Sequence, residues 1–147
     1  MRQAGRYMSV YRELRKQYTL LDLCRIPDLA TEVTMQPVQA IELDAAILFS
    51  DLLLPLEPMG IRFDFIKGEG PQIENPIDGD DDINRLRPFE SRESLGHVLQ
   101  AIRQIQIAVG DGWHLDMQVD PVHQRTRDPA QIIVATDRNA GAGAGRV

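Results

Sequence analysis

Residues 45–51 have the sequence AAILFSD. Residues 45–49 are apolar and uncharged, which predicts a short strand buried on both faces, as in parallel sheets. A helical pattern precedes them, and a helix followed by a buried strand is typical of an α/β fold. Asp51 follows the strand, where α/β proteins often carry site residues. Asp51 is therefore either a functional carboxylate or a cap for the following turn, and the residues alone favour neither.

Two helices are predicted before this strand. The spacing of tyrosines and a leucine over residues 7–18 places them on one helix face. Pro27 and Asp28 are typical of a helix start, because proline fits the first turn and an early acid suits the helix dipole. Pro37 should kink or end this second helix near Gln36. Its apolar stripe consists of Leu29, Val33 and Ile41.

Shorter elements are predicted after the strand. Residues 61–65 alternate between apolar and polar, and residues 72–74 can form the return strand of a hairpin. Residues 78–82 form an acidic turn that lacks the glutamate of a calcium loop and leads into a short helix. Ser91 should cap a third helix. The buried stripe of that helix consists of Leu95, Val98, Leu99, Ile102 and Ile105.

Composition restricts the class of protein. The chain has 147 residues, a net charge of −6 and a pI of about 5.0, which argues against general nucleic-acid binding. Its single cysteine, Cys24, lies in an apolar context, which indicates a packing thiol and fits a reducing, cytoplasmic setting. We expect no membrane association, because no apolar run approaches a membrane span. His97 is expected at the surface, and His114 and His123 lack the spacing of metal ligands.

The opening run, residues 1–7, is MRQAGRY. Arg2 and Arg6 present planar donor forks that suit carboxylates, and two guanidiniums held close together repel unless they share an anion. Ala4 and Gly5 leave room for a ligand near the backbone. The run is therefore either an anion-binding loop or a solvated terminus, and the residues alone slightly favour the terminus. Arg15 is a weaker candidate for the same anion.

Several stretches together resemble the uroporphyrinogen decarboxylase family. The run MRQAGRY at 1–7 is similar to the family signature, and LDAAILFSDLL at 43–53 is similar to its second motif. Between and after them, YRELR at 11–15, EVTMQPV at 32–38 and GEGP at 68–71 also resemble the family. The likeness continues to about Gln106.

The resemblance implies a cytosolic homodimer without a cofactor or metal, built on a (β/α)8 barrel. It implies removal of carboxyl groups from the four acetate side chains of uroporphyrinogen III, which gives coproporphyrinogen III. Asp51 would face the pyrrole N–H groups and must stay ionised, so hydrogen-bond donors must offset its burial. The residues expected to bind the substrate are Arg2, Gln3, Ala4, Gly5, Arg6, Asp51 and, more weakly, Arg15; Asp51, Arg2 and Arg6 would be catalytic.

The sequence also departs from that family. A complete barrel needs roughly 250 residues, so we expect only the N-terminal part of a barrel over residues 1–109. Residues 110–147 lack a clear period apart from one strand predicted at 132–135, and we interpret them as a divergent, disordered or frame-shifted tail. A catalytically inactive remnant that binds an anionic tetrapyrrole remains an alternative. A corrinoid-linked methyltransferase of the same superfamily is a second.

Overall fold

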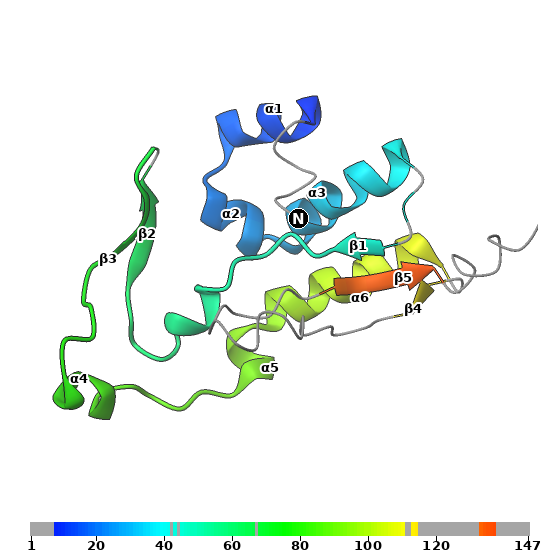
Figure 1. The fold of residues 1–147 in the computed structure, drawn as a ribbon. Coiled ribbons are helices and arrows are strands. Elements are labelled where there is room, and N and C mark those ends of the chain that lie inside the picture. Colours follow the sequence, from blue (N-terminus) through cyan, green and yellow to red (C-terminus); the bar gives the residue numbers. More distant parts are fainter. Residues whose placement is uncertain are drawn as a thin grey trace, which may run out of the picture.

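The computed structural model describes residues 8–41, 43, 45–66, 68–110, 113–114 and 133–137. It shows an α/β arrangement of helices, a small sheet and a separate hairpin (Figure 1). The helices are α1 (Ser9–Gln17), α2 (Leu20–Arg25), α3 (Pro27–Ala40), α4 (Asp80–Asn84), α5 (Ser91–Ser94), α6 (Gly96–Val109) and the short 3-10 helix η2 (Leu54–Leu56). The strands are β1 (Ala45–Ile47), β2 (Phe63–Ile66), β3 (Gly70–Ile73), β4 (Trp113–His114) and β5 (Ile133–Asp137).

The first two helices meet at a capped turn. α1 confirms the predicted N-terminal helix and buries Tyr11, while Tyr18 ends it in an extended conformation. α2 was not predicted from the sequence. The Thr19 hydroxyl accepts the backbone N–H of Asp22 at 3.0 Å, and an Asp22 carboxylate oxygen accepts the Thr19 N–H at 2.8 Å. This reciprocal capping box satisfies two otherwise unpaired N–H groups and starts α2 one residue after Thr19.

α3 passes through Pro37 without ending. The prediction that this helix stops or kinks near Gln36 is wrong about the end, because α3 reaches Ala40. Proline removes only one N–H, and the carbonyl of Pro37 still accepts the N–H of Ile41 at 3.0 Å. The proposed stripe is also too long, because Ile41 lies beyond the helix and is 52% exposed.

The three-stranded sheet corrects the expectation of parallel pairing. Its strand order is β1-β5-β4, and β5 is antiparallel to both neighbours (Figure 1). β1 and β4 therefore point in the same direction with α6 in the connection between them, as in a βαβ unit. However, β5 fills the position beside β1 that a parallel neighbour would take. The strand predicted at 132–135 is confirmed in position by β5.

β1 is also shorter and less buried than predicted. It covers three residues, of which Ala46 is buried while Ala45 and Ile47 are half-buried. The register shifts between Ala46 and Ile47, so one extra residue of β5 lies opposite this point. The apolar run continues past the strand, where Leu48 is buried in the core. The apolar residues at this point pack in the loop that follows the strand, and they do not form a strand buried on both faces.

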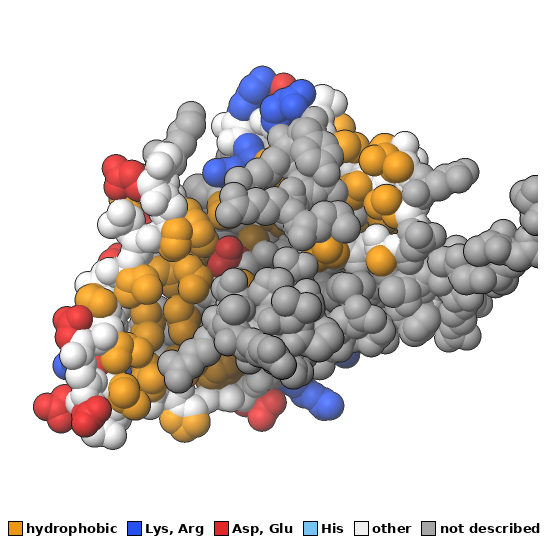
Figure 2. Space-filling model, in the orientation of Figure 1, with side chains coloured by type: hydrophobic (Ala, Val, Ile, Leu, Met, Phe, Trp, Pro, Cys, Tyr) orange, Lys and Arg blue, Asp and Glu red, His pale blue; other side chains and the backbone are white. Residues whose placement is uncertain are grey.

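The predicted hairpin is confirmed with a small shift. β2 and β3 are antiparallel, with Phe63 opposite Ile73 and Ile66 opposite Gly70. Gly68 and Gly70 both have φ of +92°, a conformation that favours glycine. Figure 2 shows apolar side chains gathered on the face over the hairpin and α4. Exposed residues of these segments and the loops beside them include Leu52, Ile66, Ile73, Ile77 and Ile83.

The predicted third helix is divided in two. Ser91 is the first residue of α5 rather than its cap, and the Glu90 carboxylate accepts the Arg92 N–H at 3.4 Å instead. Leu95 separates α5 from α6 with φ −112° and ψ 25°. The predicted stripe is confirmed only in part, because Ile105 is fully buried while Leu99 is 36% exposed.

The core is organised around α3. On one side, Ala30 and Met35 pack with Leu48 and with α6 residues Ala101 and Ile105. On another side, Val33 packs with Leu23 and Tyr11. A third cluster lies between α2, η2 and the hairpin and consists of Leu21, Cys24, Leu54 and Phe63. α3 therefore fixes the loop that follows β1.

Candidate active site

The loop after β1 is held in place by α3 and α1. The hydroxyl of Thr34, which is 3% exposed, accepts the backbone N–H of Phe49 at 2.9 Å. The same hydroxyl donates to the carbonyl of Ala30 at 2.7 Å. The Phe49 ring packs edge-on against Tyr11, with centroids 5.7 Å apart and planes at 61°. This loop therefore leaves the sheet along a defined path toward Asp51.

Asp51 is half-buried and forms the turn into η2. Its Oδ1 accepts the N–H of Leu53 at 2.9 Å, and its carbonyl accepts the N–H of Leu54 at 3.3 Å. Asp51 thus caps the following turn. Among the described residues, the carboxylate accepts this one hydrogen bond.

Cys24 lies close enough to Asp51 for their charges to interact. Burial and, to a smaller extent, the charge of Asp51 raise the pKa of Cys24 to about 12, while the charges of Arg25 and Arg15 oppose the rise. The prediction of a buried packing thiol is confirmed, because Cys24 is 3% exposed and packs with Leu21 and Leu54. A thiol with so high a pKa is not a nucleophile at neutral pH.

A second group of charges lies beside α6. Arg25 and Glu57 form an ion pair that links the end of α2 to the residue after η2. Burial and the Arg25 charge lower the pKa of His97, while Glu57 raises it. The prediction that His97 is a surface residue is wrong, because it is half-buried and its Nε2 is buried without a partner among the described residues. The helix is interrupted at Leu95, two residues before His97, and helical periodicity did not predict this break.

Within the described part of the chain, no hydrogen bond joins Arg15 to Asp51. Its guanidinium donates to the carbonyl of Tyr18 at 2.7 Å, at the end of its own helix. Arg15 also lines a cavity of about 330 Å³ between the α1–α2 junction and β2, where Asp64 lies opposite. Asp51 does not line this cavity.

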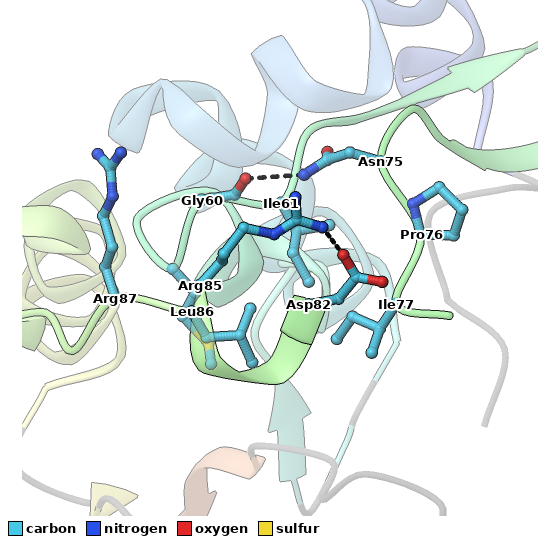
Figure 3. Close-up of a pocket in the computed structure, with 10 residues that line it drawn as sticks. Gly60, Ile61, Asn75, Pro76, Ile77, Asp82, Arg85, Leu86 and Arg87 are labelled. Carbon is cyan, nitrogen blue, oxygen red and sulfur yellow. Dashed lines mark hydrogen bonds and ion pairs between the residues drawn. The ribbon is translucent and has the colours of Figure 1, made fainter. Parts of the chain in front are cut away.

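Another cavity, of about 260 Å³, lies between the hairpin and α4 and includes none of the predicted site residues. Figure 3 shows two pairs among its polar groups, while the side chain of Arg87 carries no marked interaction with the other residues drawn. Arg85 extends across to Asp82, and the Asn75 amide donates to the Gly60 carbonyl at 3.0 Å. The pair between Asn75 and Gly60 joins the loops on either side of the hairpin.

The other predicted site residues, Arg2, Gln3, Ala4, Gly5 and Arg6, lie outside the described residues. Sequence reasoning also missed two polar residues of α3, Thr34 and Gln36, which are 3% and 8% exposed. Their signal was present in the sequence, because polar side chains within a buried helical stretch need a local or tertiary partner. Thr34 has such a partner in Phe49.

The described part of the chain contains no group of three or more His, Cys, Asp or Glu residues that would hold a metal ion. None of its helices combines the length and the hydropathy needed to cross a membrane.

The described structure is an α/β arrangement in which Asp51 follows the first strand. The sequence model of the uroporphyrinogen decarboxylase (URO-D) family matches residues 1–116. The chain belongs to this family.

Individual relatives agree with this assignment. A protein from Sorangium cellulosum named uroporphyrinogen decarboxylase is 61% identical over 106 residues, which are 72% of this chain and 30% of the relative. Proteins of the same name from Solibacter usitatus and Carboxydothermus hydrogenoformans are 50% and 52% identical over 71% and 70% of the chain. The matched parts are 30% and 29% of those relatives, so the chain spans less than a third of their length.

Proposed function

We propose that this chain contributes the N-terminal part of a uroporphyrinogen decarboxylase, which converts uroporphyrinogen III to coproporphyrinogen III by removing the carboxyl groups of four acetate side chains. Membership of the family is the observation that carries the proposal. The names of the relatives point to the same reaction. The half-buried carboxylate of Asp51, with a single donor among the described residues, supplies a suitable chemical group.

Asp51 would act on the reacting ring. Before carbon dioxide leaves, protonation places positive charge on a pyrrole. A fixed carboxylate near the pyrrole N–H groups stabilises that charge, and partial exclusion of water strengthens the effect. The turn supports this role, because the Leu53 N–H holds one carboxylate oxygen and leaves the other available.

The opening run would bind the carboxylates of the substrate. Uroporphyrinogen is a polyanion, and Arg2 and Arg6 offer bidentate donors to it in a chain whose net charge is −6. Gln3, Ala4 and Gly5 would line the same loop. Arg15 is a weaker contributor, because the Tyr18 carbonyl already accepts a hydrogen bond from its guanidinium.

We further propose that residues 1–109 form part of a (β/α)8 barrel in a cytoplasmic homodimer and that residues 110–147 form a divergent tail. The shared direction of β1 and β4, with α6 between them, supports a barrel-like βαβ unit. Translation of the neighbouring nucleotides in the other frames tests a frame-shifted tail. A frame that restores an apolar strand after about residue 109 supports this explanation, and its absence in every frame contradicts it.

Turnover by the purified chain tests the function. Uroporphyrinogen III is incubated with the protein, and chromatography follows products with seven to four carboxylates. Asp51→Asn is the most informative variant, because the amide oxygen of asparagine can still accept the Leu53 N–H while the negative charge is lost. We expect a roughly 10²- to 10³-fold loss of kcat. Arg103→Lys on the exposed face of α6 is the matched control and should leave turnover unchanged.

An inactive remnant that binds the tetrapyrrole is the second candidate. The observation that favours it is that the chain matches only 30% of the length of the Sorangium cellulosum relative. Binding measured by fluorescence quenching, without any product, would support the remnant and contradict catalysis by this chain. Substitution of Arg2 and Arg6 by Lys should then weaken binding, because Lys cannot form the bidentate contact. Equal turnover by wild type and Asp51→Asn would contradict the role of Asp51.

A further inference from the structure

Thr34 is a buried polar residue in α3 whose hydroxyl takes part in two hydrogen bonds. The hydroxyl donates to the carbonyl of Ala30, one turn earlier in the same helix, at 2.7 Å, and it accepts the backbone N–H of Phe49 at 2.9 Å. A hydroxyl has one proton to donate, so the bond to Ala30 leaves its lone pairs free to accept. Bonding back to the helix carbonyl gives a threonine little stability by itself. The bond that leaves the helix, to Phe49, is therefore the one that gives the hydroxyl a role.

Phe49 is held on two sides, and it lies two residues before Asp51. Its N–H is bonded to Thr34, and its ring packs edge-on against Tyr11 with the ring centroids 5.7 Å apart. Two residues of extended chain span at most about 7 Å. The chain between Phe49 and Asp51 therefore has little slack, and a shift of Phe49 is passed on to Asp51.

The other side of Asp51 is held by apolar packing. Its Oδ1 accepts the N–H of Leu53 at 2.9 Å, and its carbonyl accepts the N–H of Leu54 at 3.3 Å. Leu54 is 2% exposed and packs with Leu21 and Cys24. Asp51 thus lies between an apolar anchor that follows it and an anchor before it that includes the hydroxyl of Thr34.

We propose that Thr34 is a positioning residue for Asp51: by holding the Phe49 N–H, its hydroxyl sets the place of the Asp51 carboxylate. The consequence for catalysis rests on the proposed function, in which that carboxylate stabilises charge on a pyrrole ring. A misplacement of about 1 Å at such a group can lower the rate roughly 100-fold. The geometric claim, that Thr34 controls the contact between Asp51 and Leu53, does not rest on that function and is tested separately.

Amide hydrogen exchange, followed residue by residue by NMR in the intact chain without substrate, tests the geometric claim. Thr34→Val keeps the shape of the side chain and removes the hydroxyl. We expect the amide of Phe49 to exchange roughly tenfold faster in this variant, because it loses its acceptor. The amide of Leu53 should also accelerate, because its partner Asp51 is no longer held in place. Thr34→Ser keeps the hydroxyl and should restore both rates.

Thr31→Val is the matched control on the same helix. The Thr31 hydroxyl bonds Gln104 at 2.7 Å and so joins α3 to α6, away from the loop that carries Asp51. This variant should leave the exchange of the Phe49 and Leu53 amides unchanged. Thr34→Cys is a second test variant for the case that Thr34→Val does not fold. Its thiol is a weak acceptor, so it should accelerate the same two amides by a smaller factor.

Three outcomes overturn the geometric claim. The first is exchange of the wild-type Phe49 amide at its intrinsic rate, which would mean that the bond to Thr34 is not maintained. The second is faster exchange at Phe49 without any change at Leu53. The third is equal acceleration at Ile105, which is fully buried in α6, because that would indicate general loosening of the core.

The consequence for activity is measured on its own. If the wild type turns over uroporphyrinogen, Thr34→Val should lower kcat roughly 10- to 100-fold and change KM little, because the Asp51 charge acts on the transition state. Thr34→Ser should restore kcat. Faster exchange at Leu53 without any turnover by the wild type would refute the proposed function and leave the geometric claim supported. Normal kcat in a variant with accelerated Leu53 exchange would overturn the catalytic role of Thr34.

Discussion

The backbone N–H of Phe49 donates a hydrogen bond of 2.9 Å to the hydroxyl of Thr34. The contact joins the middle of α3 to the loop that carries Asp51, two residues further along. Thr34 is buried, at 3% exposed, and the hydrogen bond is part-buried. The position of the candidate carboxylate therefore depends on the side chain of Thr34, which lies fifteen residues before Phe49 in the sequence.

Replacement of Thr34 by Val should test this contact, because it keeps the shape and removes the hydroxyl. The N–H of Phe49 would lose its partner in a part-buried place, so we expect a loss of about 1–3 kcal/mol in the free energy of unfolding. Urea denaturation followed by circular dichroism measures it. Thr31→Val is the control, because the Thr31 hydroxyl bonds the half-buried Gln104, which can turn to water. A cost of Thr34→Val no larger than that of the control would contradict this assignment.

The capping box at Thr19 gives a second prediction. Thr19→Ala removes the oxygen that accepts the Asp22 N–H and should cost about 1 kcal/mol, whereas Thr19→Ser should cost little. Hydrogen bonds from Thr19 lower the pKa of Asp22 below its usual 3.8. Stability from Asp22 is then present above pH 3.8 and is lost as pH falls through the lower folded-state value. The free energy of unfolding of Asp22→Asn should not show this loss on acidification. The same pH dependence in both proteins would contradict the capping box.

His97 should make the fold sensitive to mild acid. Burial and Arg25 lower its pKa in the folded state below the ordinary 6.5. The unfolded chain then binds more protons as pH falls below about 6.5, so stability decreases with decreasing pH in that window. Unfolding midpoints in urea between pH 7.5 and 5 measure the effect. His97→Gln should flatten the profile, and an unchanged slope would assign the pH dependence to another group.

Cys24 should resist thiol reagents in the native protein. Its pKa is raised to about 12, and its side chain is 3% exposed, so little thiolate is present or accessible at pH 8. Labelling with a maleimide should be slow in buffer and fast in concentrated urea, as mass spectrometry would show. Rapid native labelling would mean that the cluster of Leu21, Leu54 and Phe63 opens readily.

Much of the local structure follows from short stretches of sequence. The spacing of Tyr11 and Leu14 predicted α1, and the alternation at 61–65 predicted the β2–β3 hairpin. The signal for α2 was also local, but the pairing of Thr19 with Asp22 was overlooked. In the same way, MRQAGRY and LDAAILFSDLL were sufficient to predict the family that the URO-D match over residues 1–116 shows.

Short stretches of the chain were therefore enough to predict α1, the start of α3, the hairpin and the family, because each depends on neighbouring residues or on a motif. The pairing of β1 with β5, the partial burial of His97 and, within the described residues, the burial of Gln36 without a hydrogen-bond partner arise only from tertiary packing. The physical reason is that strand pairing and the burial of polar groups involve residues far apart in the chain. Their energies depend on how all elements pack together, which no local pattern records.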